Sequence, residues 1–139
     1  MYQHILFAVE FGEKTYLVVE KLKKLVELFQ AQLSLIHIVE LPIIDVFPEI
    51  PNKEQLYVKQ AKEQLTEFAK KLNVSAANQY VEIGNPKIII PEFIKQHKIN
   101  LLIVGHHERR GVYHLLGSTA YALVSHAKCD VLTIPFNFI

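Results

Sequence analysis

The sequence has little cysteine and almost no net charge. Its single cysteine, Cys129, cannot form a disulfide within the chain, and such scarcity is typical of a reducing compartment. We expect Cys129 to be a small, half-buried residue without special reactivity. A net charge of +1 provides no field that would attract nucleic acid or an anionic membrane, so neither is an expected partner.

Long apolar runs and targeting signals are also missing. No apolar run approaches the roughly 18 residues of a membrane-spanning helix. The opening MYQHILFAVEFGEK lacks the basic start and the small-residue cleavage site of a signal peptide. We therefore expect a cytoplasmic protein.

Several catalytic motifs are absent. The sequence contains no G-x-x-x-x-G-K-[ST] loop, no G-x-G-x-x-G after its first strand and no G-x-S-x-G elbow. The His-x-Gly-His and Ser-Gly-Gly loops of related nucleotide enzymes are absent too. We expect no catalytic residue and no dedicated enzyme, although weak ATPase activity or autophosphorylation stays open.

What the sequence does contain is enough for one globular domain, residues 1–139. Half of the residues are hydrophobic, and a chain of this size buries roughly two-thirds of its unfolded surface. Short apolar runs alternate with helical patterns. The runs predict strands over residues 4–11, 33–40, 76–83, 100–105 and 130–136.

The helical segments are amphipathic. A first helix is expected over about 13–32 and a second over 53–73, with apolar residues every three or four positions. These residues are Val18, Leu22, Leu25 and Phe29 in the first helix, and Val58, Ala61, Leu65, Phe68 and Leu72 in the second. Between strand two and this helix, residues 41–51 contain three prolines and form a loop, either a lid on a crevice or part of a dimer contact.

The start of the third helix has two interpretations. Asn85 can cap a helix that has Pro86 at its first position, but Pro91 would then lie inside the helix, without an amide to donate. The helix therefore either continues with a kink at Pro91 or begins there and runs to about Lys98. Ser118 is the expected N-cap of a fourth helix that ends near His126 and Lys128.

The order β α β α β α β α β predicts an α/β fold, an open parallel sheet with helices on both faces. In such sheets ligands bind beyond the carboxyl ends of the strands, where the winding direction reverses. If strand one is central and strand four is its neighbour, the crevice is formed by residues 10–12 and 105–119. The pattern alone does not give this strand order.

Several segments together resemble the universal stress protein family: HILFAVEFGEKT, LSLIHIVE, GNP and, most closely, NLLIVGHHERRG with LLGSTAYALVSHAKCDVLTIP. The resemblance covers the whole chain and implies a Rossmann-like fold of the adenine nucleotide alpha hydrolase type, with strand order 3-2-1-4-5. It also implies a role in stress response and a homodimer paired through the last strand. The residues of that interface would be Val131, Leu132, Thr133, Ile134, Pro135 and Phe136.

Many members of this family bind ATP through a Gly-x2-Gly-x9-Gly-Ser/Thr motif, in which the glycines let the backbone approach the phosphates. Gly105 and Gly117 with Ser118 match the ends of this motif, but Glu108 stands at the middle glycine and the loop is one residue short. GHHE resembles the universal stress protein A type, which lacks the motif. Arg109 with Arg110 is either a solvated pair or an anion clamp, and Gly111 could replace the lost glycine.

The resemblance therefore leaves two hypotheses: a non-enzymatic regulatory dimer that binds ATP poorly, or a nucleotide-dependent switch that binds ATP with magnesium. Residue by residue, the nucleotide site would comprise Val9, Glu10, Ile38, Val104, Gly105, His107, Arg109, Arg110, Gly117, Ser118 and Thr119.

The histidines do not indicate a metal site. His106, His107 and His114 lack the i, i+4 spacing or a cysteine partner, so we expect them to be exposed or hydrogen-bonded. His37, within the second predicted strand, is expected to be a core histidine with its hydrogen bonds satisfied.

Overall fold

A computed structural model describes residues 1–12, 14–41, 51–106 and 117–136. The strands are β1 (His4–Ala8), β2 (Gln32–Val39), β3 (Gln79–Ile83), β4 (Leu101–His106) and β5 (Asp130–Pro135). The α-helices are α1 (Val19–Phe29), α2 (Lys53–Leu72), α3 (Pro86–Gln96) and α4 (Ser118–His126). Short 3-10 helices, η1 (Thr15–Val18) and η2 (Ala76–Asn78), precede α1 and β3.

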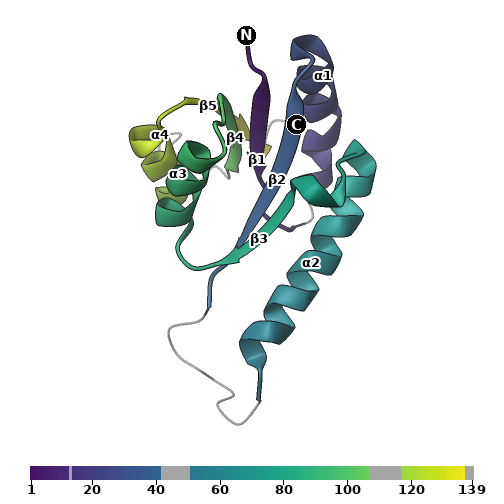
Figure 1. The fold of residues 1–139 in the computed structure, drawn as a ribbon, viewed down its shortest axis with the longest axis vertical. Helices are drawn as coiled ribbons and strands as arrows, with labels where there is room; N and C mark the ends of the chain where they lie inside the picture. The colour runs from purple at the N-terminus through teal and green to yellow at the C-terminus, as the bar shows by residue number, and fades with distance from the viewer. Residues whose placement is uncertain (13, 42–50, 107–116, 137–139) are drawn as a thin grey trace.

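The five strands form one parallel sheet in the order β3-β2-β1-β4-β5 (Figure 1), which confirms the predicted fold class and strand order. β1 is central and pairs with β2 from His4 opposite Gln32 and with β4 from Ile5 opposite Leu101. The chain therefore winds from β1 outward in one direction and then returns to begin β4 on the other side of β1.

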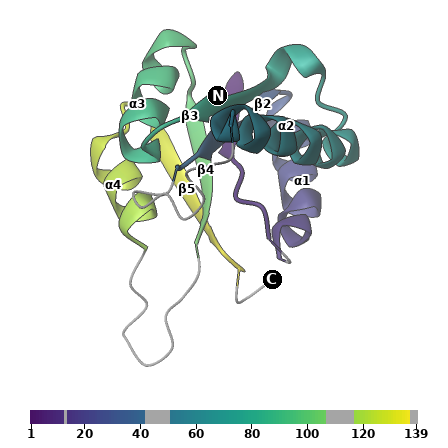
Figure 2. The ribbon, with the colours of Figure 1, turned by 90° about the horizontal axis from the view of Figure 1, so that it is seen from below.

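Two hydrophobic cores lie on the two faces of the sheet. Helices α1 and α2 cover one face and α3 and α4 the other, as the view from below shows (Figure 2). Side chains of β1 point alternately to these cores: Ile5 and Phe7 enter the α1/α2 core, and Leu6 the α3/α4 core. All three side chains are fully buried, which explains the continuous apolar run in this strand.

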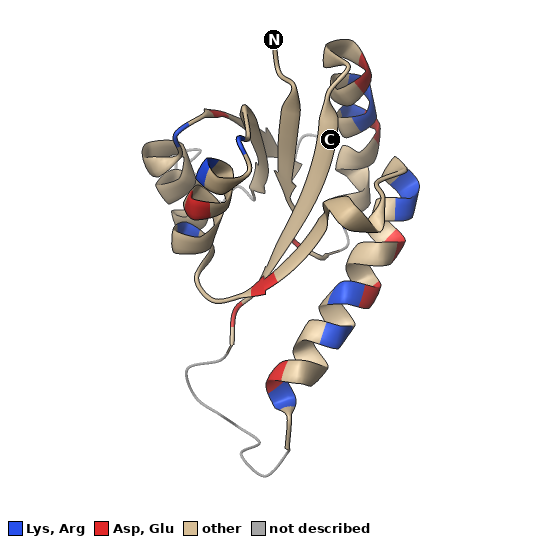
Figure 3. Ribbon diagram, in the orientation of Figure 1, with Lys and Arg blue, Asp and Glu red and all other residues tan. Residues whose placement is uncertain are grey.

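The predicted apolar faces of the first two helices are the faces that pack on the sheet. Val18 and Leu22 are buried, as are Ala61, Leu65 and Phe68 on α2. Charged residues of both signs are spread along the length of α2 (Figure 3).

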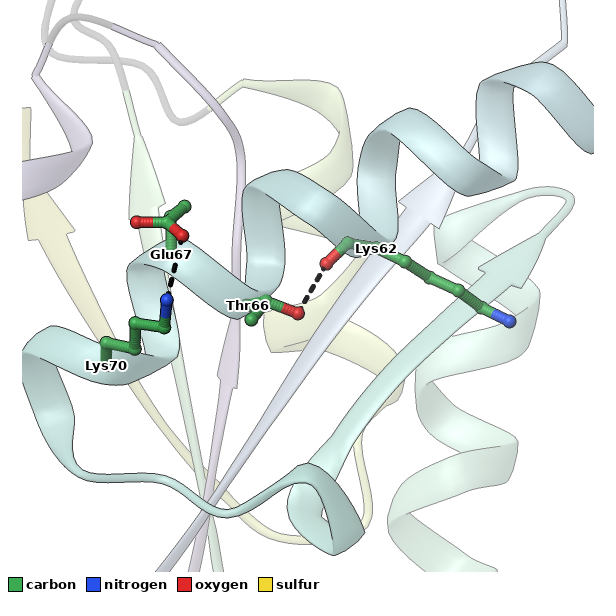
Figure 4. A network of polar contacts seen from close by, with 4 residues as sticks. All are labelled: Lys62, Thr66, Glu67 and Lys70. Carbon is green, nitrogen blue, oxygen red and sulfur yellow. Dashed lines mark hydrogen bonds and ion pairs between the residues drawn. The ribbon is translucent and has the colours of Figure 1, made fainter.

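Two of the local contacts on α2 are drawn in Figure 4. There Lys70 pairs with Glu67 at 3.0 Å, and the Thr66 hydroxyl donates to the Lys62 carbonyl at 2.8 Å. The lysine–glutamate pair is solvent-exposed, so it contributes little to stability.

Several predicted boundaries are wrong by a few residues. β1 ends at Ala8 rather than at 11, although the Val9 amide still donates to the Ile36 carbonyl at 2.8 Å. Regular α-helix begins only at Val19 because η1 precedes it. β3 begins at Gln79, after η2 takes up residues that we assigned to the strand.

Helix α3 begins at Pro86 and continues through Pro91, so the interpretation in which the helix starts at Pro86 is correct and the start at Pro91 is wrong. The Asn85 side chain accepts a hydrogen bond from the Lys87 amide at 3.0 Å, as an N-cap does. Gly84 leads into this cap with φ = 145°, a conformation that side chains other than hydrogen rarely permit.

Strand β5 lies at the edge of the sheet and ends at Pro135, one residue before its predicted end. Proline has no amide hydrogen for a further ladder bond, as expected. The apolar residues of the predicted loop, Ile43, Ile44, Val46 and Phe47, lie outside the described residues, so its role as a lid or as part of a dimer contact stays a prediction.

Candidate functional site

A cavity of about 290 Å³ opens at the carboxyl ends of β1, β2 and β4, at the position where the winding of the sheet reverses. Its walls are largely apolar because the alternate side chains of these strands face α3 and α4 there. The apolar lining consists of Ala8, Val9, Phe11, Ile36, Ile38, Pro86, Ile90, Val104, Ala120 and Leu123.

Polar side chains line the part of the cavity formed by the ends of β1 and β2. The Nδ1 atom of His37 lies 2.7 Å from the Val9 carbonyl oxygen, and the Phe11 ring packs against the imidazole at 4.3 Å between centroids. A carbonyl can only accept, so Nδ1 carries the hydrogen. The expectation of a satisfied His37 is confirmed, but this residue is half-buried at a cavity wall rather than in the core.

Two exposed carboxylates, Glu10 and Glu40, complete this part of the lining. Within the described part of the chain, neither side chain has a hydrogen bond or an ion pair. The Thr15 hydroxyl donates to the backbone carbonyl of Glu10 and so holds the turn that follows β1. Figure 3 shows an acidic residue, in red, where the chain leaves β2.

A larger hollow of about 520 Å³ lies along α2 and beside Ile83, but it is less suited to a ligand. Its lining comes almost entirely from one solvent-exposed helix face and carries lysines and glutamates that have water as an alternative partner. The cavity at the strand ends instead draws its lining from three strands and two helices. We therefore take the latter as the candidate site.

The structure brings six of the predicted nucleotide-site residues together at this cavity: Val9, Glu10, Ile38, Val104, Gly105 and Thr119. Gly117 and Ser118 lie immediately before Thr119 but do not line it. His107, Arg109 and Arg110 lie outside the described residues, as do Glu108, Gly111 and His114. That these residues bind a nucleotide stays a prediction.

Sequence reasoning missed His37 and Glu40 as lining residues. Glu40 follows the last residue of β2 directly, so its position was readable once the strand end was known. His37 faces the cavity because its ring turns toward the Val9 carbonyl at the end of the neighbouring strand. That contact joins residues 28 positions apart, and no local pattern indicates it.

Gly105 has a packing role that the motif did not suggest. A methyl group on its α-carbon would overlap the ring of Phe136, which is buried in the α1/α2 core. Glycine at this position therefore admits an aromatic ring on one face of β4. In the ATP-binding motif the same glycine lets the backbone approach the phosphates. Because packing against Phe136 already explains Gly105, its presence alone is not evidence for a phosphate site.

The fourth helix is capped by Gly117 rather than by Ser118, so that prediction is wrong by one residue. Gly117 has the non-helical ψ of 160° that a cap requires, and Ser118 is already the first helical residue. The structure shows no side-chain hydrogen bond at this cap. The first amides of α4 therefore lack the side-chain acceptor that an N-cap residue commonly provides.

His106 is half-buried, and the expectation of a hydrogen-bonded ring fails at one of its two nitrogen atoms. Its Nδ1 atom is buried and has no hydrogen-bond partner among the residues that the structure describes. Over the same residues, no group of three potential metal ligands gathers.

An open, doubly wound α/β sheet with a cavity at its switch point defines a class of proteins that bind small ligands there. A family model described as "Universal stress protein family" matches residues 1–135. The chain belongs to this family.

Individual relatives agree with this assignment. "Universal stress protein A homolog 2" of Coxiella burnetii is 40% identical over 120 residues, which cover 84% of this chain and 82% of that protein. "Universal stress protein UspA from Lactobacillus plantarum" has a similar fold, with a TM-score of 0.68, 23% identity and coverage of 96% and 97%. A universal stress protein solved in complex with cAMP has a TM-score of 0.62 and 18% identity, with coverage of 97% and 98%.

None of the helices in the described ranges is both long enough and apolar enough to span a membrane.

Proposed function

We propose that this protein is a regulatory member of its family that acts through ligand occupancy and partner binding, without catalytic turnover, as a single domain in the cytoplasm. The observation that carries the proposal is the cavity at the ends of β1, β2 and β4. Its apolar walls suit a flat base and its polar margin can orient an attached sugar. The sequence lacks the P-loop, the G-x-G-x-x-G turn and the G-x-S-x-G elbow, and this supports a role without turnover.

An adenine compound is the ligand class that we propose for this cavity. A universal stress protein of similar fold was solved in complex with cAMP, which supports that class. We expect ATP itself to bind weakly, because Glu108 replaces the glycine at which the backbone would approach the phosphates.

Calorimetry with ATP and magnesium tests this expectation. A dissociation constant in the low micromolar range would contradict it and would favour the alternative, an ATP-dependent switch with slow hydrolysis. Glu108→Gly should raise ATP affinity if backbone access is the limit. If affinity does not rise, the shortened loop is the cause instead.

We also propose a homodimer paired through β5. The strand is at the sheet edge, and an edge strand offers unpaired backbone groups to a second copy. Of the predicted interface side chains, Ile134 and Phe136 point into the core, whereas Leu132 is 37% exposed. Contact between copies would therefore use the backbone of β5 and the side chain of Leu132.

Light scattering at micromolar concentration tests the dimer, and a monomer would refute it. Leu132→Lys places a charge at the proposed contact of both copies and should shift the protein toward monomer. Leu28→Lys is the matched control, because Leu28 is 73% exposed on α1, and it should leave the dimer intact.

A further inference from the structure

Strand β3 lies at the edge of the sheet opposite to β5. Within the described ranges its only partner strand is β2. Its sequence, QYVEI, contains no proline and no lysine, which are residues that commonly protect an exposed edge from pairing. The backbone of β3 can therefore accept a further strand.

The backbone groups at this edge belong to Val81 and Ile83. The Gly84 amide donates to the Val39 carbonyl at 3.0 Å, so the amide of Gly84 points toward β2. Because the backbone groups of successive residues in a strand point to opposite sides, those of Glu82 also face β2, whereas those of Val81 and Ile83 face away from it. Among the described residues, no strand lies beside the two amides and two carbonyls of Val81 and Ile83.

A hollow of α2 adjoins this edge. It has a volume of about 520 Å³, and Val58, Thr66 and Ile83 are among its lining residues. Val81 packs on the α1/α2 core, and the side chain of Ile83, two residues further along β3, lies on the same face of the sheet and is 40% exposed. The hollow is too open for a small molecule, but a strand paired with β3 would direct every second side chain into it.

The hollow also contains a lysine without a described counter-charge, Lys62. The positions three and four residues away on α2 hold Val58, Lys59, Leu65 and Thr66. Of the two glutamates in the lining, Glu63 follows Lys62 directly and so faces another direction, and Glu54 lies about two turns away. Figure 4 shows the Lys62 side chain extended away from the Glu67–Lys70 pair, and its ammonium has no ion pair within the described part of the chain. A carboxylate on an incoming segment would offset this charge.

We propose that β3 and α2 together bind an extended segment of a partner protein, which adds a sixth strand to the sheet. The segment has apolar side chains at alternate positions, which enter the hollow, and an acidic residue that pairs with Lys62. This surface shares no lining residue with the strand-end cavity. The inference therefore goes beyond the proposed function, which assigns no surface to a partner protein.

Fluorescence anisotropy with a labelled peptide tests the inference. The peptide has seven residues and blocked ends, with threonine at the odd positions, valine at positions two and four, and glutamate at position six. We expect a dissociation constant below about 1 mM. A peptide of the same composition but with adjacent valines should bind at least tenfold more weakly, because a strand directs adjacent side chains to opposite faces.

Methylation of the peptide amides tests for strand pairing. One peptide carries N-methyl groups at positions two and four, and another carries them at positions three and five. Only one of these two sets of amides can face β3, so one peptide should bind at least tenfold more weakly and the other should bind as the unmodified peptide does. Equal binding of the two methylated peptides overturns the addition of a strand.

Reversal of the charge at position 62 tests the acidic contact. Lys62→Glu should weaken binding of the glutamate peptide severalfold, and a peptide with lysine at position six should bind this variant more tightly than it binds the wild type. Lys71→Glu is the matched control, because Lys71 is an exposed lysine on α2 outside the hollow, and it should bind the glutamate peptide as the wild type does. Unchanged binding by Lys62→Glu contradicts the proposed chemistry of the segment.

A second copy of this chain is the competing occupant of the β3 edge. Ile83→Lys should bind the glutamate peptide severalfold more weakly and keep the wild-type mass in light scattering. A fall in mass would mean that a second copy occupies this edge, and the proposal would be wrong. If the unmodified peptide does not bind the wild type, the inference fails, while the proposed ligand at the strand-end cavity is unaffected.

Discussion

Replacing Gly105 by alanine separates a packing role from a phosphate role at this position. The added methyl group would overlap the buried Phe136 ring, and overpacking of this kind costs about 1–3 kcal/mol. Alanine loses less backbone entropy on folding than glycine does, which stabilises a strand by about 0.5–1 kcal/mol. The backbone of Gly105 is not in the positive-φ region, so no further strain enters. The two ranges leave a net loss between about 0 and 2.5 kcal/mol, and we expect about 1–2 kcal/mol in the free energy of unfolding because the buried Phe136 ring has little room to move away.

Urea unfolding of the ligand-free protein measures this loss. With a slope near 2 kcal/mol per molar, the midpoint should fall by about 0.5–1 M. Gly12→Ala is the matched control, because nothing lies within 4 Å of the position of its added methyl group, and its midpoint should stay at the wild-type value or rise slightly.

A double-mutant cycle assigns the cost to the Phe136 ring. Phe136→Ala alone should destabilise the protein by a few kcal/mol, as truncation of a buried aromatic side chain does. In that background, Gly105→Ala should cost little or nothing, which gives a coupling energy of about 1–2 kcal/mol. A Gly105→Ala variant as stable as wild type, or a cycle without coupling, would refute the packing role.

Two further predictions concern stability. Asn85→Ala removes the hydrogen bond to the Lys87 amide and should cost about 0.5–2 kcal/mol in urea unfolding, whereas Asn78→Ala, which loses only an exposed contact with Gln32, should cost less. Burial lowers the pKa of His4 below its usual 6.5, and the nearby charge of His97 lowers it further. A hydrogen bond between the His4 ring and the His97 backbone raises the pKa, but it does not cancel the effect of burial. As the pH falls, His4 is therefore protonated in the unfolded state before it is protonated in the folded state. The stability that the neutral His4 ring contributes is present above about pH 6.5 and is lost as the pH falls from there toward the pKa of the folded protein. Between pH 7.5 and 5.5, His4→Gln should lose less stability than the wild type, and equal losses would contradict this assignment; the exposed His126→Gln serves as the control.

Local patterns predicted most of the elements correctly. The apolar spacing of Leu22 on α1 and of Ala61 and Leu65 on α2 identified the faces that are buried, because a helix repeats every 3.6 residues whatever it packs against. The N-cap at Asn85 was equally local, since its hydrogen bond spans two residues. Boundaries failed where a single helical turn intervened, as at η1 and η2, because such turns have no periodicity of their own.

The candidate site was predictable only in part. Glu10, Val104 and Gly105 followed from the family motif and from the ends of the strands, and the structure places all three at the cavity. The roles of His37 and Phe136 were not predictable. Each depends on a contact with a residue far away in the sequence, the Val9 carbonyl for one and Gly105 for the other.

The alternation of strands and amphipathic helices, and hence an α/β sheet, could be predicted from the amino-acid pattern, because it depends on spacing within a single segment. The folded chain was needed to show which strand ends meet, that Glu40 joins Glu10 at the cavity, and that Gly105 makes room for Phe136. The reason is physical: side chains from separate strands become neighbours only when the sheet forms, and its pairing positions the end of each strand against the next.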